Sequence, residues 1–559
     1  MTIQATRTHA DPITTELIRN ALRAAANQIR LAVIRSAFSP TIYESQDFSC
    51  GVFDAEGRLI GQDDGPPSFL GIMGQSVRAA TAASGGPASL EPGDVIMNTW
   101  AYEIGSHSQD VTLTIPAFHD GTLVGFVGIK GHVIDLGQKD AAIGVDTTDI
   151  WQEGTIFPNV KVYRAGERNE DLWRTFMANS RVPDVLAGDF NSFIGAAKLG
   201  VDTLAAIVEK YTLPGYLNAI EVMFDAGERV ARDRISAAPD GRYVSRAYVE
   251  GFDAANAIEF DVVVEISGDR LVVDFTDAPA QQSTPFNTPV GMTESNARAA
   301  VASVIGGGES ANEGFTRAIE IKTTPGTIMH ATPPAPVALY LFLMDPIEAV
   351  YRALSQALPD KVSAPVGAPV QIMFAYGMTA DGGFWGSLFS FVGGQGATPT
   401  HDGASPLLQV AAGGIRAASV EVLEARAPIV VEHKEIAVDS AGAGTTRGYP
   451  GTDYALRALQ PLMASILIDG TVHPPGHGFH GGTDGRANSA AIRRGDGSVE
   501  PYTKVAGAFL MPGDRIEAHS GGGGGFGSPS GRSRASVLAD IEQGVITEAS
   551  ARTLYPQAF

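Results

Sequence analysis

The segment from Asn98 to Gly137 constrains the fold more than any other part of this chain. It contains two apolar runs, VTLTIPAF and LVGFVGI, on either side of the dipeptide Asp120-Gly121. A dipeptide of this type between two apolar runs is typical of a β-hairpin turn. The segment therefore predicts two neighbouring strands that belong to one sheet.

Two histidine–aspartate pairs stand next to these predicted strands. His107 and Asp110 come just before the first run, and His132 and Asp135 follow the second with the same spacing. Neighbouring strands can bring such side chains together at one end of a sheet, and imidazole with carboxylate suits Zn, Mn or Fe. The plainer alternative is that these side chains close turns or cap helices. The repetition of the pair favours the metal site.

The size and composition indicate a globular protein with several hydrophobic cores. The chain has 559 residues, and its 65 glycines and 33 prolines favour a turn-rich, sheet-rich architecture. The net charge of −22 argues against nucleic acid and anionic membranes as partners. No run of 18 apolar residues appears and the N-terminus lacks a signal-peptide pattern, so we expect a cytoplasmic protein.

The only cysteine, Cys50, excludes two kinds of site. One cysteine cannot form a disulfide within the chain, and it cannot supply the thiolate cluster of a cysteine-ligated metal. Its neighbours in DFSCGVFD are largely apolar. We therefore expect Cys50 to be a small buried hydrophobic residue rather than a nucleophile.

The N-terminal segment predicts a long helix. Asp11 is a favourable N-cap, Pro12 suits the first helical position, and Ser39-Pro40 ends the pattern. Apolar residues recur at helical spacing, which indicates that one face is buried. The residues expected on that face are Ile13, Leu17, Ala21, Ala24, Ile29 and Val33.

The fold class predicted for the whole chain is α+β. We expect a mixed, sheet-rich multidomain body with an N-terminal helix and a Gly-rich β C-terminal region. Residues 182–234 have helical patterns, whereas residues 235–279 read as consecutive strands with Gly-Asp turns. These changes suggest an N-terminal metal-site domain over 11–235, a central α+β region over 236–410 and a C-terminal Gly-rich β region over 411–559.

Two further motifs contain residues that could bind a ligand. HPPGHGFHGG offers His473, His477 and His480, but its prolines and glycines exclude helical ligand spacing, so a packed loop is the favoured interpretation. HSGGGGGFG lacks the Gly-Lys-Ser/Thr ending of a phosphate loop, so we expect a place where backbones approach closely. No dinucleotide fingerprint follows a strand. The sequence therefore does not support ATP binding by this chain alone.

Several segments together resemble the hydantoinase B/5-oxoprolinase family. They include DPITTELIRNALRAAANQIRLAVIRSAF, IWQEGTIFPNVKVY, ANSRVPDVLAGDF and MPGDRIEAHSGGGGGFGSP, and the resemblance runs from about residue 11 to 556. The chain departs from the family pattern at Asn98-Thr99-Trp100, where Asn-Asp-Pro is usual. We therefore expect a different wall for the substrate pocket.

The resemblance implies one subunit of an ATP-dependent cyclic amidase that opens a hydantoin, lactam or 5-oxoproline ring. The partner implied is a hydantoinase A-type subunit that carries ATP and Mg, in a heterotetramer or a larger complex. Two alternatives remain open. The chain could be the matching subunit of an ATP-dependent ketone carboxylase of the acetone or acetophenone type, or a scaffold subunit without catalytic activity.

The resemblance also implies a set of site residues. The family's ligands to a divalent metal, with Zn or Mn expected, match Asp47, His107, Asp110 and His132 here. Asp135 is then expected to act in catalysis, either as a general base or by orienting a histidine ligand. Neither the resemblance nor the residues identify the substrate.

Overall fold

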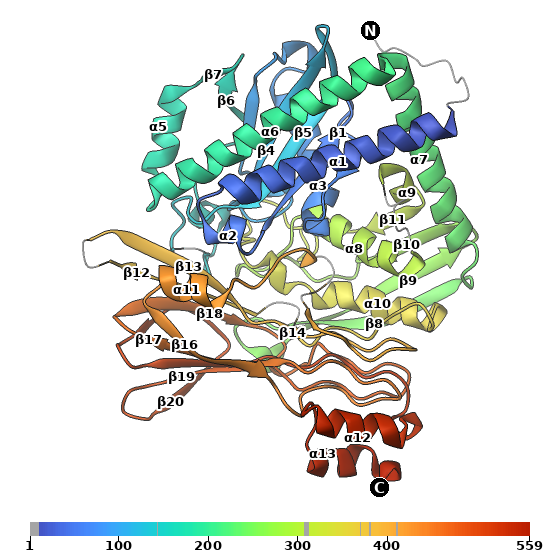
Figure 1. Cartoon of the computed structure of the whole chain (residues 1–559), viewed down its shortest axis with the longest axis vertical. Coiled ribbons are helices and arrows are strands. Elements are labelled where there is room, and N and C mark those ends of the chain that lie inside the picture. Colours follow the sequence, from blue (N-terminus) through green and yellow to red (C-terminus); the bar gives the residue numbers. More distant parts are fainter. Residues whose placement is uncertain are drawn as a thin grey trace.

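The computed structural model describes residues 11–141, 143–306, 312–368, 371–379, 382–407, 409 and 412–559. Figure 1 shows the helical N-terminal part, the sheet-rich C-terminal part and the two chain ends at opposite sides of the molecule. The helices are α1 Pro12–Ser36, α2 Pro40–Tyr43, α3 Pro67–Ala83, α4 Ala101–Ile104, α5 Glu170–Ala178, α6 Pro183–Tyr211, α7 Leu213–Ile235, α8 Val290–Ile305, α9 Glu313–Thr316, α10 Asp345–Ala357, α11 Val420–Arg426, α12 Arg534–Glu542 and α13 Glu548–Leu554.

Helix α1 begins where the sequence predicts. The Asp11 side chain accepts hydrogen bonds from the backbone N–H groups of Ile13 and Thr14, and so satisfies donors that have no partner within the helix. The predicted buried face is wrong at three positions, because Ile13 and Leu17 are 70% and 51% exposed and Ala24 is exposed as well. The face that packs on the core consists instead of Ile18, Leu22, Ala25, Ala26, Ile29 and Val33.

The N-terminal sheet contains the predicted hairpin. Its strand order is β2-β1-β5-β4-β3-β6-β7. The strands are β1 Phe48–Phe53, β2 Leu59–Gln62, β3 Val95–Asn98, β4 Asp110–His119, β5 Thr122–His132, β6 Val160–Arg164 and β7 Glu167–Arg168. Asp120 and Gly121 both have positive φ, as a two-residue turn of type I′ requires. Helices α1 and α6 cross one face of this sheet side by side (Figure 1).

The central part adds a second sheet in the order β11-β10-β9-β8. Its strands are β8 Gly241–Val249, β9 Ile258–Ser267, β10 Arg270–Asp274 and β11 Ile319–Lys322. Helix α10 packs on β8 and β9, and also contacts α8. The segment between β11 and α10 runs back toward the N-terminal sheet, where its residues 337–340 contact the site described below.

The C-terminal part contains two sheets and a short strand pair. The orders are β13-β12-β18-β21, β16-β17-β22-β19-β20 and β14-β15. The strands are β12 Gln371–Met378, β13 Phe384–Ser390, β14 Gly393–Gly394, β15 Pro406–Leu407, β16 Ile429–Ile436, β17 Thr452–Ala458, β18 Leu462–Ile468, β19 Ser489–Arg493, β20 Val499–Tyr502, β21 Lys504–Leu510 and β22 Arg515–His519.

The glycine run Gly521–Gly525 lies in a bundle of closely packed backbones, as expected. A Cβ atom on Gly524 would lie 1.9 Å from the carbonyl oxygen of His477, which no side chain can tolerate. Backbone hydrogen bonds join the run to neighbouring segments, among them Ala397 N–H to Gly524 O at 2.9 Å. The glycines therefore serve close packing.

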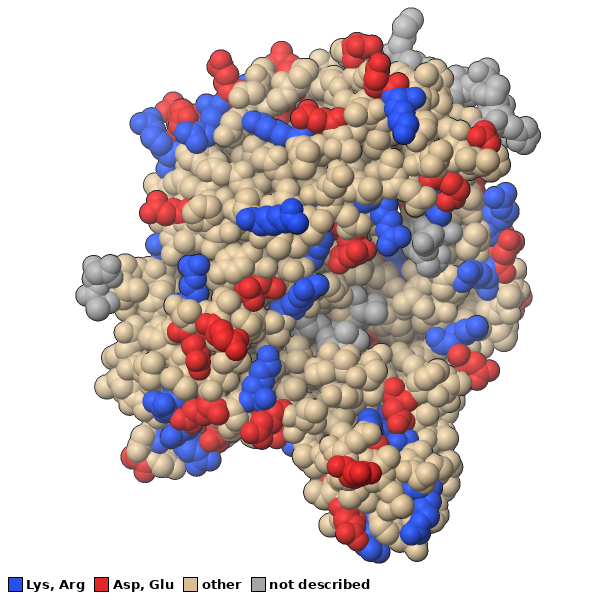
Figure 2. All heavy atoms as spheres, viewed as in Figure 1, with Lys and Arg blue, Asp and Glu red and all other residues tan. Residues whose placement is uncertain are grey.

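These elements confirm the mixed α+β class. The sheet β13-β12-β18-β21 joins strands from both sides of residue 410, so a boundary there does not separate two sheets. The three-domain division stays a prediction. Helix α6 is the one described helix long and apolar enough to cross a membrane, and half of its apolar window is buried inside the protein, as in a core helix. Figure 2 shows acidic and basic side chains interspersed over one face.

Candidate metal centre

The β4–β5 hairpin brings the two histidine–aspartate pairs to the same end of the sheet. Asp110 opens β4 and His132 closes β5, and the two residues are direct partners in the antiparallel ladder. His107 lies in the turn before β4, where its carbonyl accepts the N–H of Asp110 at 3.1 Å. Three of the four predicted side chains therefore converge.

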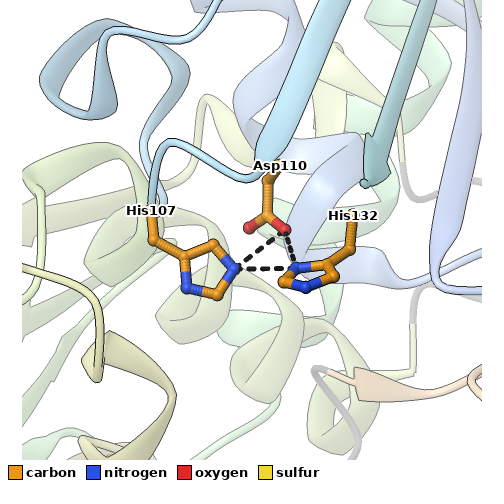
Figure 3. A group of neighbouring side chains, drawn as sticks. All are labelled: His107, Asp110 and His132. Carbon is orange, nitrogen blue, oxygen red and sulfur yellow. Dashed lines mark hydrogen bonds and ion pairs between the residues drawn. The ribbon is translucent and has the colours of Figure 1, made fainter. Parts of the chain in front are cut away.

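We call His107, Asp110 and His132 the His/Asp cluster. His107 Nε2, Asp110 Oδ1 and His132 Nδ1 form a triangle with each side 3.0 Å (Figure 3). All three side chains are buried. Such a group of nitrogen and oxygen atoms could hold a metal ion.

The hydrogen bonds around His107 indicate why a cation fits there. His107 Nδ1 lies 3.0 Å from the carbonyl oxygen of Ala338, which can only accept, so Nδ1 carries the proton. In the neutral ring Nε2 then has a lone pair, and that lone pair faces the Asp110 carboxylate. Two acceptors at this distance require a proton or a cation between them. A buried metal ion would satisfy both.

The charge state of Asp110 suits the same role. Burial alone would raise the pKa of this carboxyl group, but when the position between His107 and Asp110 is filled by a proton on Nε2, the charge of that ring and hydrogen bonds from His107 and His132 hold the pKa well below its usual range. Asp110 is therefore a carboxylate at neutral pH. The Tyr340 hydroxyl donates to its second oxygen, Oδ2, at 3.0 Å, and orients the group.

A distant segment supports the His/Asp cluster from outside. Ala338 and Tyr340, which contact His107 and Asp110, follow a turn held by Glu153. Glu153 Oε1 accepts the N–H groups of Val337 and Ala338, each at 2.8 Å. Burial raises the pKa of Glu153 to about 8. Neither Glu153 nor Tyr340 was predicted as a site residue. Glu153 lies in IWQEGTIFPNVKVY, a segment that resembles the family, whereas the sequence around Tyr340 has no motif that would identify it.

Asp47 lies beside the cluster but is not one of its three converging residues. It precedes β1, and its backbone carbonyl accepts the N–H of His132 at 3.0 Å. Its Oδ1 is buried and has no hydrogen-bond partner, and burial raises the pKa of this carboxyl group to about 6. A buried carboxyl oxygen without a hydrogen-bond partner, next to His132, is suited to binding a cation. Its role as a ligand stays a prediction.

A buried arginine fixes the backbone on both sides of Asp47. Arg30 donates to the Phe48 carbonyl at 3.0 Å and to Gln46 Oε1 at 2.9 Å, and it forms an ion pair with Asp63 at 3.2 Å. Gln46 adopts a φ of 55°, which is uncommon for a residue other than glycine. The clamp holds residues 46–48 in the turn that presents Asp47.

Asp135 does not join the cluster. Its Oδ1 accepts a hydrogen bond from Arg181 Nη1 at 2.6 Å, and its Oδ2 accepts from the Arg181 backbone N–H and, at 3.4 Å, from the Ser180 hydroxyl. These contacts fix the chain at residues 180–181. The expected catalytic role of Asp135 stays a prediction, and the structure places its carboxylate against Arg181.

Lys130 is a buried lysine next to the cluster. Its Nζ donates to the carbonyls of Ile104 at 3.1 Å and Asp110 at 2.9 Å, and burial lowers its pKa to about 7. The sequence motifs did not indicate it. The available signal was that this lysine interrupts the apolar run LVGFVGIKGH two residues before His132. Because an unpaired charge is rarely buried in a strand, a lysine at this position indicates a special environment.

A cavity of about 110 Å³ opens on the cluster. Its walls combine polar groups at the cluster with apolar side chains from β12, β13 and the segment that precedes α10. The lining residues are Asp47, Ser68, Phe69, His107, Asp110, His132, Ile143, Tyr340, Leu341, Met344, Gln371, Ile372, Phe374, Leu388, Ser390, Ala412 and Ile415. A small molecule bound there would contact the cluster directly.

The histidines of HPPGHGFHGG form no comparable group within the described ranges. His473 stacks on Tyr248 with ring centroids 4.4 Å apart, and His480 packs against Phe526 at 5.0 Å. His477 lies 3.8 Å from Asp484. The favoured interpretation of this motif as a packed loop agrees with these contacts.

Comparisons with known proteins agree with this architecture. The Hydantoinase B/oxoprolinase family matches residues 11–529. A putative D-/L-hydantoinase component of the B type from Pseudomonas sp. (strain NS671) is 29% identical over 98% of this chain and 95% of the relative. The crystal structure of an ATP-dependent caprolactamase from Pseudomonas jessenii superposes with a TM-score of 0.90 at 27% identity, covering 98% of this chain and 96% of that one.

An acetone carboxylase without nucleotide shares the fold. Its TM-score is 0.89 at 19% identity, and the match covers 98% of this chain and 79% of the carboxylase chain. The family match spans the N-terminal sheet with its His/Asp cluster, the central sheet and the glycine-rich bundle. This chain belongs to the hydantoinase B/oxoprolinase family.

Proposed function

We propose that this chain is the metal-dependent hydrolytic subunit of an ATP-dependent cyclic amidase. The observation that carries the proposal is the buried His/Asp cluster at the floor of a small cavity. Family membership supports the class of reaction, because relatives are named as hydantoinase and caprolactamase subunits. The substrate proposed is a hydantoin, lactam or 5-oxoproline ring.

Two histidines and two aspartates would hold the metal. His107, Asp110 and His132 direct a nitrogen, an oxygen and a nitrogen to one point, and Asp47 adds a buried oxygen without a partner. This mixture of neutral nitrogen and anionic oxygen suits Zn or Mn. When bound, such an ion supplies Lewis acidity toward a carbon–oxygen group and toward water.

The protein's own groups prepare the site for this chemistry. The Ala338 carbonyl keeps the proton on His107 Nδ1, so Nε2 stays available as a lone pair. Tyr340 holds the Asp110 carboxylate in one orientation. The apolar walls of the cavity exclude bulk water, which strengthens electrostatic interactions with the substrate. We propose that Asp135 acts indirectly, by fixing residues 180–181.

The energy for ring opening would come from a partner. An unstrained amide resists water at neutral pH, and no phosphate-loop or dinucleotide motif occurs in this chain. We therefore propose that ATP and Mg are held by a hydantoinase A-type partner, which activates the amide in a cytoplasmic heterotetramer or larger complex. The proposal of a partner subunit is supported by two relatives, which are named as subunits of a hydantoinase and of a caprolactamase.

Reconstitution tests the proposal. The chain, its A-type partner and ATP are mixed with a panel of lactams, hydantoins and ketones, with and without bicarbonate, and ring opening is followed together with ATP hydrolysis. We expect a lactam or hydantoin to drive ATP hydrolysis without bicarbonate. Turnover that requires bicarbonate and a ketone would instead establish a carboxylase. Partner binding with no turnover of any compound, in a metal-loaded complex, would establish a scaffold.

A further inference from the structure

Lys130 is buried on the same face of the N-terminal sheet as the proposed ligands. It is fully buried on β5, two residues before His132. Alternate residues of a strand point to the same face, so the Lys130 side chain lies beside that of His132. A lysine is almost never buried unless its amino group has partners inside the protein. Those partners indicate what Lys130 does.

The amino group binds both ends of the loop that carries His107. We call residues 105–109 the ligand loop. Lys130 Nζ donates to the carbonyl oxygen of Ile104 at 3.1 Å and to that of Asp110 at 2.9 Å. Ile104 is the last residue of α4 and Asp110 is the first residue of β4. Lys130 therefore holds together the residues immediately before and after the loop, and Figure 3 shows how the loop leads from His107 into Asp110.

Both carbonyl oxygens lie where the backbone offers no regular donor. The last carbonyls of a helix have no partner within the helix, and Ile104 ends α4. His132 is the ladder partner of Asp110, but it gives its N–H to the Asp47 carbonyl at 3.0 Å. A buried carbonyl without a donor is costly, and Lys130 supplies a donor to each of the two.

The ligand loop has few other side-chain contacts to fix its shape. Residues 106–109 are at most 2% exposed. Within the described part of the chain, the hydroxyls of Ser106 and Ser108 have no hydrogen-bond partner, so they do not help to hold the loop. The bonds at the two ends then matter more. A shift of either end would displace His107 Nε2 relative to Asp110 Oδ1, which lie 3.0 Å apart.

Lys130 acts through the loop and does not touch the cavity. Its Nζ lies 5.2 Å from the ring centroid of Phe69, which lines the cavity. Lys130 itself is not among the described residues of the lining. A molecule in the cavity would therefore meet Phe69 and the proposed ligands, whereas Lys130 would contact only the backbone that positions them.

The charge of Lys130 and its hydrogen bonds have opposite effects on a bound cation. A divalent ion at the His/Asp cluster would repel a positive charge on Lys130. The two hydrogen bonds do not need that charge, because the ammonium group and the neutral amine both carry at least two N–H groups. A lysine that acted through its charge would weaken metal binding. A lysine that holds the loop would strengthen it.

We propose that Lys130 is a positioning residue of the metal centre, and that it holds the ligand loop so that His107 and Asp110 face one ion. The proposal rests on the proposed function, because it assumes that a metal ion binds at the His/Asp cluster. It extends the centre to a residue that contacts the backbone on both sides of the loop and none of the proposed ligand atoms.

Lys130→Met tests the proposal, because methionine has a similar length and no donor. The Kd for Zn²⁺ and for Mn²⁺ is measured on the folded full-length chain by competition with a chromophoric chelator. We expect Lys130→Met to bind each ion about tenfold more weakly than the wild type, or weaker still. Unchanged binding would overturn the proposal. Tighter binding would also overturn it, because the charge of Lys130 would then dominate.

Lys504 offers a matched control. Its side chain is also fully buried, and its Nζ donates to the Ile468 carbonyl and to Asp469, each at 3.2 Å. It lies 5.2 Å from the ring centroid of Phe342. Lys504→Met should lower the melting temperature, because it leaves Asp469 buried without its cation, and should change each metal Kd less than about twofold. Equal losses of metal affinity in the two lysine variants would contradict a positioning role for Lys130.

Cobalt spectroscopy gives a readout that stability alone does not change. Co²⁺ is used in place of Zn²⁺, and its absorption bands report the number and arrangement of its ligands. We expect altered bands in Co²⁺-saturated Lys130→Met and wild-type bands in Lys504→Met. Identical spectra would count against the proposal. Should Lys130→Met fail to fold, Lys130→Gln replaces it in both measurements, because its amide is polar but one bond too short to reach both carbonyls.

The metal measurements also separate the two proposals. If the His107→Ala, His132→Ala variant binds as much metal as the wild type, no ion binds at the His/Asp cluster and both proposals fail. If the metal depends on these histidines but Lys130→Met binds it equally well, only the role of Lys130 fails. If Lys130→Met binds metal more weakly and the wild-type complex opens no ring, the proposed function fails and the positioning role stands.

Discussion

Removing the Tyr340 hydroxyl should weaken metal binding without unfolding the protein. Tyr340 is 7% exposed, and its hydroxyl donates to Asp110 Oδ2 at 3.0 Å. Burial and the neighbouring charges of Asp110 and Asp47 raise the pKa of Tyr340 well above its ordinary value, so it remains a donor at neutral pH. In Tyr340→Phe the carboxylate loses this donor and the orientation that the bond imposes.

The size of the effect follows from comparable contacts. Removing a group that orients a metal ligand typically lowers metal affinity 10- to 100-fold, or about 1.4 to 2.8 kcal/mol. Tyr351 offers a matched control, because it is 8% exposed and its hydroxyl lies 2.9 Å from Ser303 Oγ on the central helices. Tyr351→Phe loses one hydrogen bond that is remote from the cluster.

Competition with a chromophoric chelator measures the affinity of each variant for Zn²⁺ and Mn²⁺. We expect Tyr340→Phe to lose at least tenfold in affinity and Tyr351→Phe to stay within twofold of the wild type. Thermal denaturation of both variants monitors the fold. Unchanged affinity in Tyr340→Phe, or equal losses in the two variants, would refute the assignment of Tyr340 as the group that orients Asp110.

Three further predictions concern the ligands, a buried acid and the glycine bundle. The double variant His107→Ala, His132→Ala should retain less than a tenth of the wild-type metal in elemental analysis, and equal metal in both proteins would contradict the site. Burial raises the pKa of Glu153 from 4.5 to about 8, so the proton is bound more tightly in the folded state and stability falls as pH rises through this range. The free energy of unfolding should fall by roughly 2 kcal/mol between pH 6 and pH 8. In Glu153→Gln, whose side chain cannot ionise, urea denaturation should show a smaller fall over the same range. An equal fall in the variant and the wild type would contradict the assignment to Glu153. Gly524→Ala should lower the free energy of unfolding by about 2 kcal/mol or more, because the new Cβ would meet the His477 carbonyl. The control Gly195→Ala has open space in α6, so it should leave the free energy of unfolding unchanged or raise it by about 0.5 kcal/mol.

Local features of the fold were predictable because their causes are local. Asp120-Gly121 closes the β4–β5 hairpin through backbone conformations that glycine and aspartate adopt readily. Asp11 caps α1 through hydrogen bonds to the next turn. The register set by this turn alone would place Asp110 opposite Gly131, and an irregularity between Ala117 and Phe118 shifts the pairing by one residue to His132. The segment therefore predicts that the two ligands lie close together, but their direct pairing depends on this local shift.

The remaining features depend on contacts between distant segments. The face of α1 that is buried was predicted wrongly at Ile13, Leu17 and Ala24, because apolar spacing alone does not say which side meets α6 and the sheet. Arg30 holds Gln46 through a contact 16 residues along the chain. Asp135 had the same spacing from a histidine as Asp110, but Arg181 binds its carboxylate instead.

The chemistry proposed for the cluster depends on more than the N-terminal sheet. The proton on His107 Nδ1 is held by a carbonyl 231 residues away, and the Asp110 carboxylate is oriented by a hydroxyl 230 residues away. The cavity walls come from β12 and β13, which belong to a sheet in the C-terminal half. A fragment of residues 11–235 would contain all four proposed ligands and lack every one of these contacts. The proposed metal site therefore depends on the whole folded chain, and the central segment 337–340 contacts both the proposed ligands and the cavity beside them.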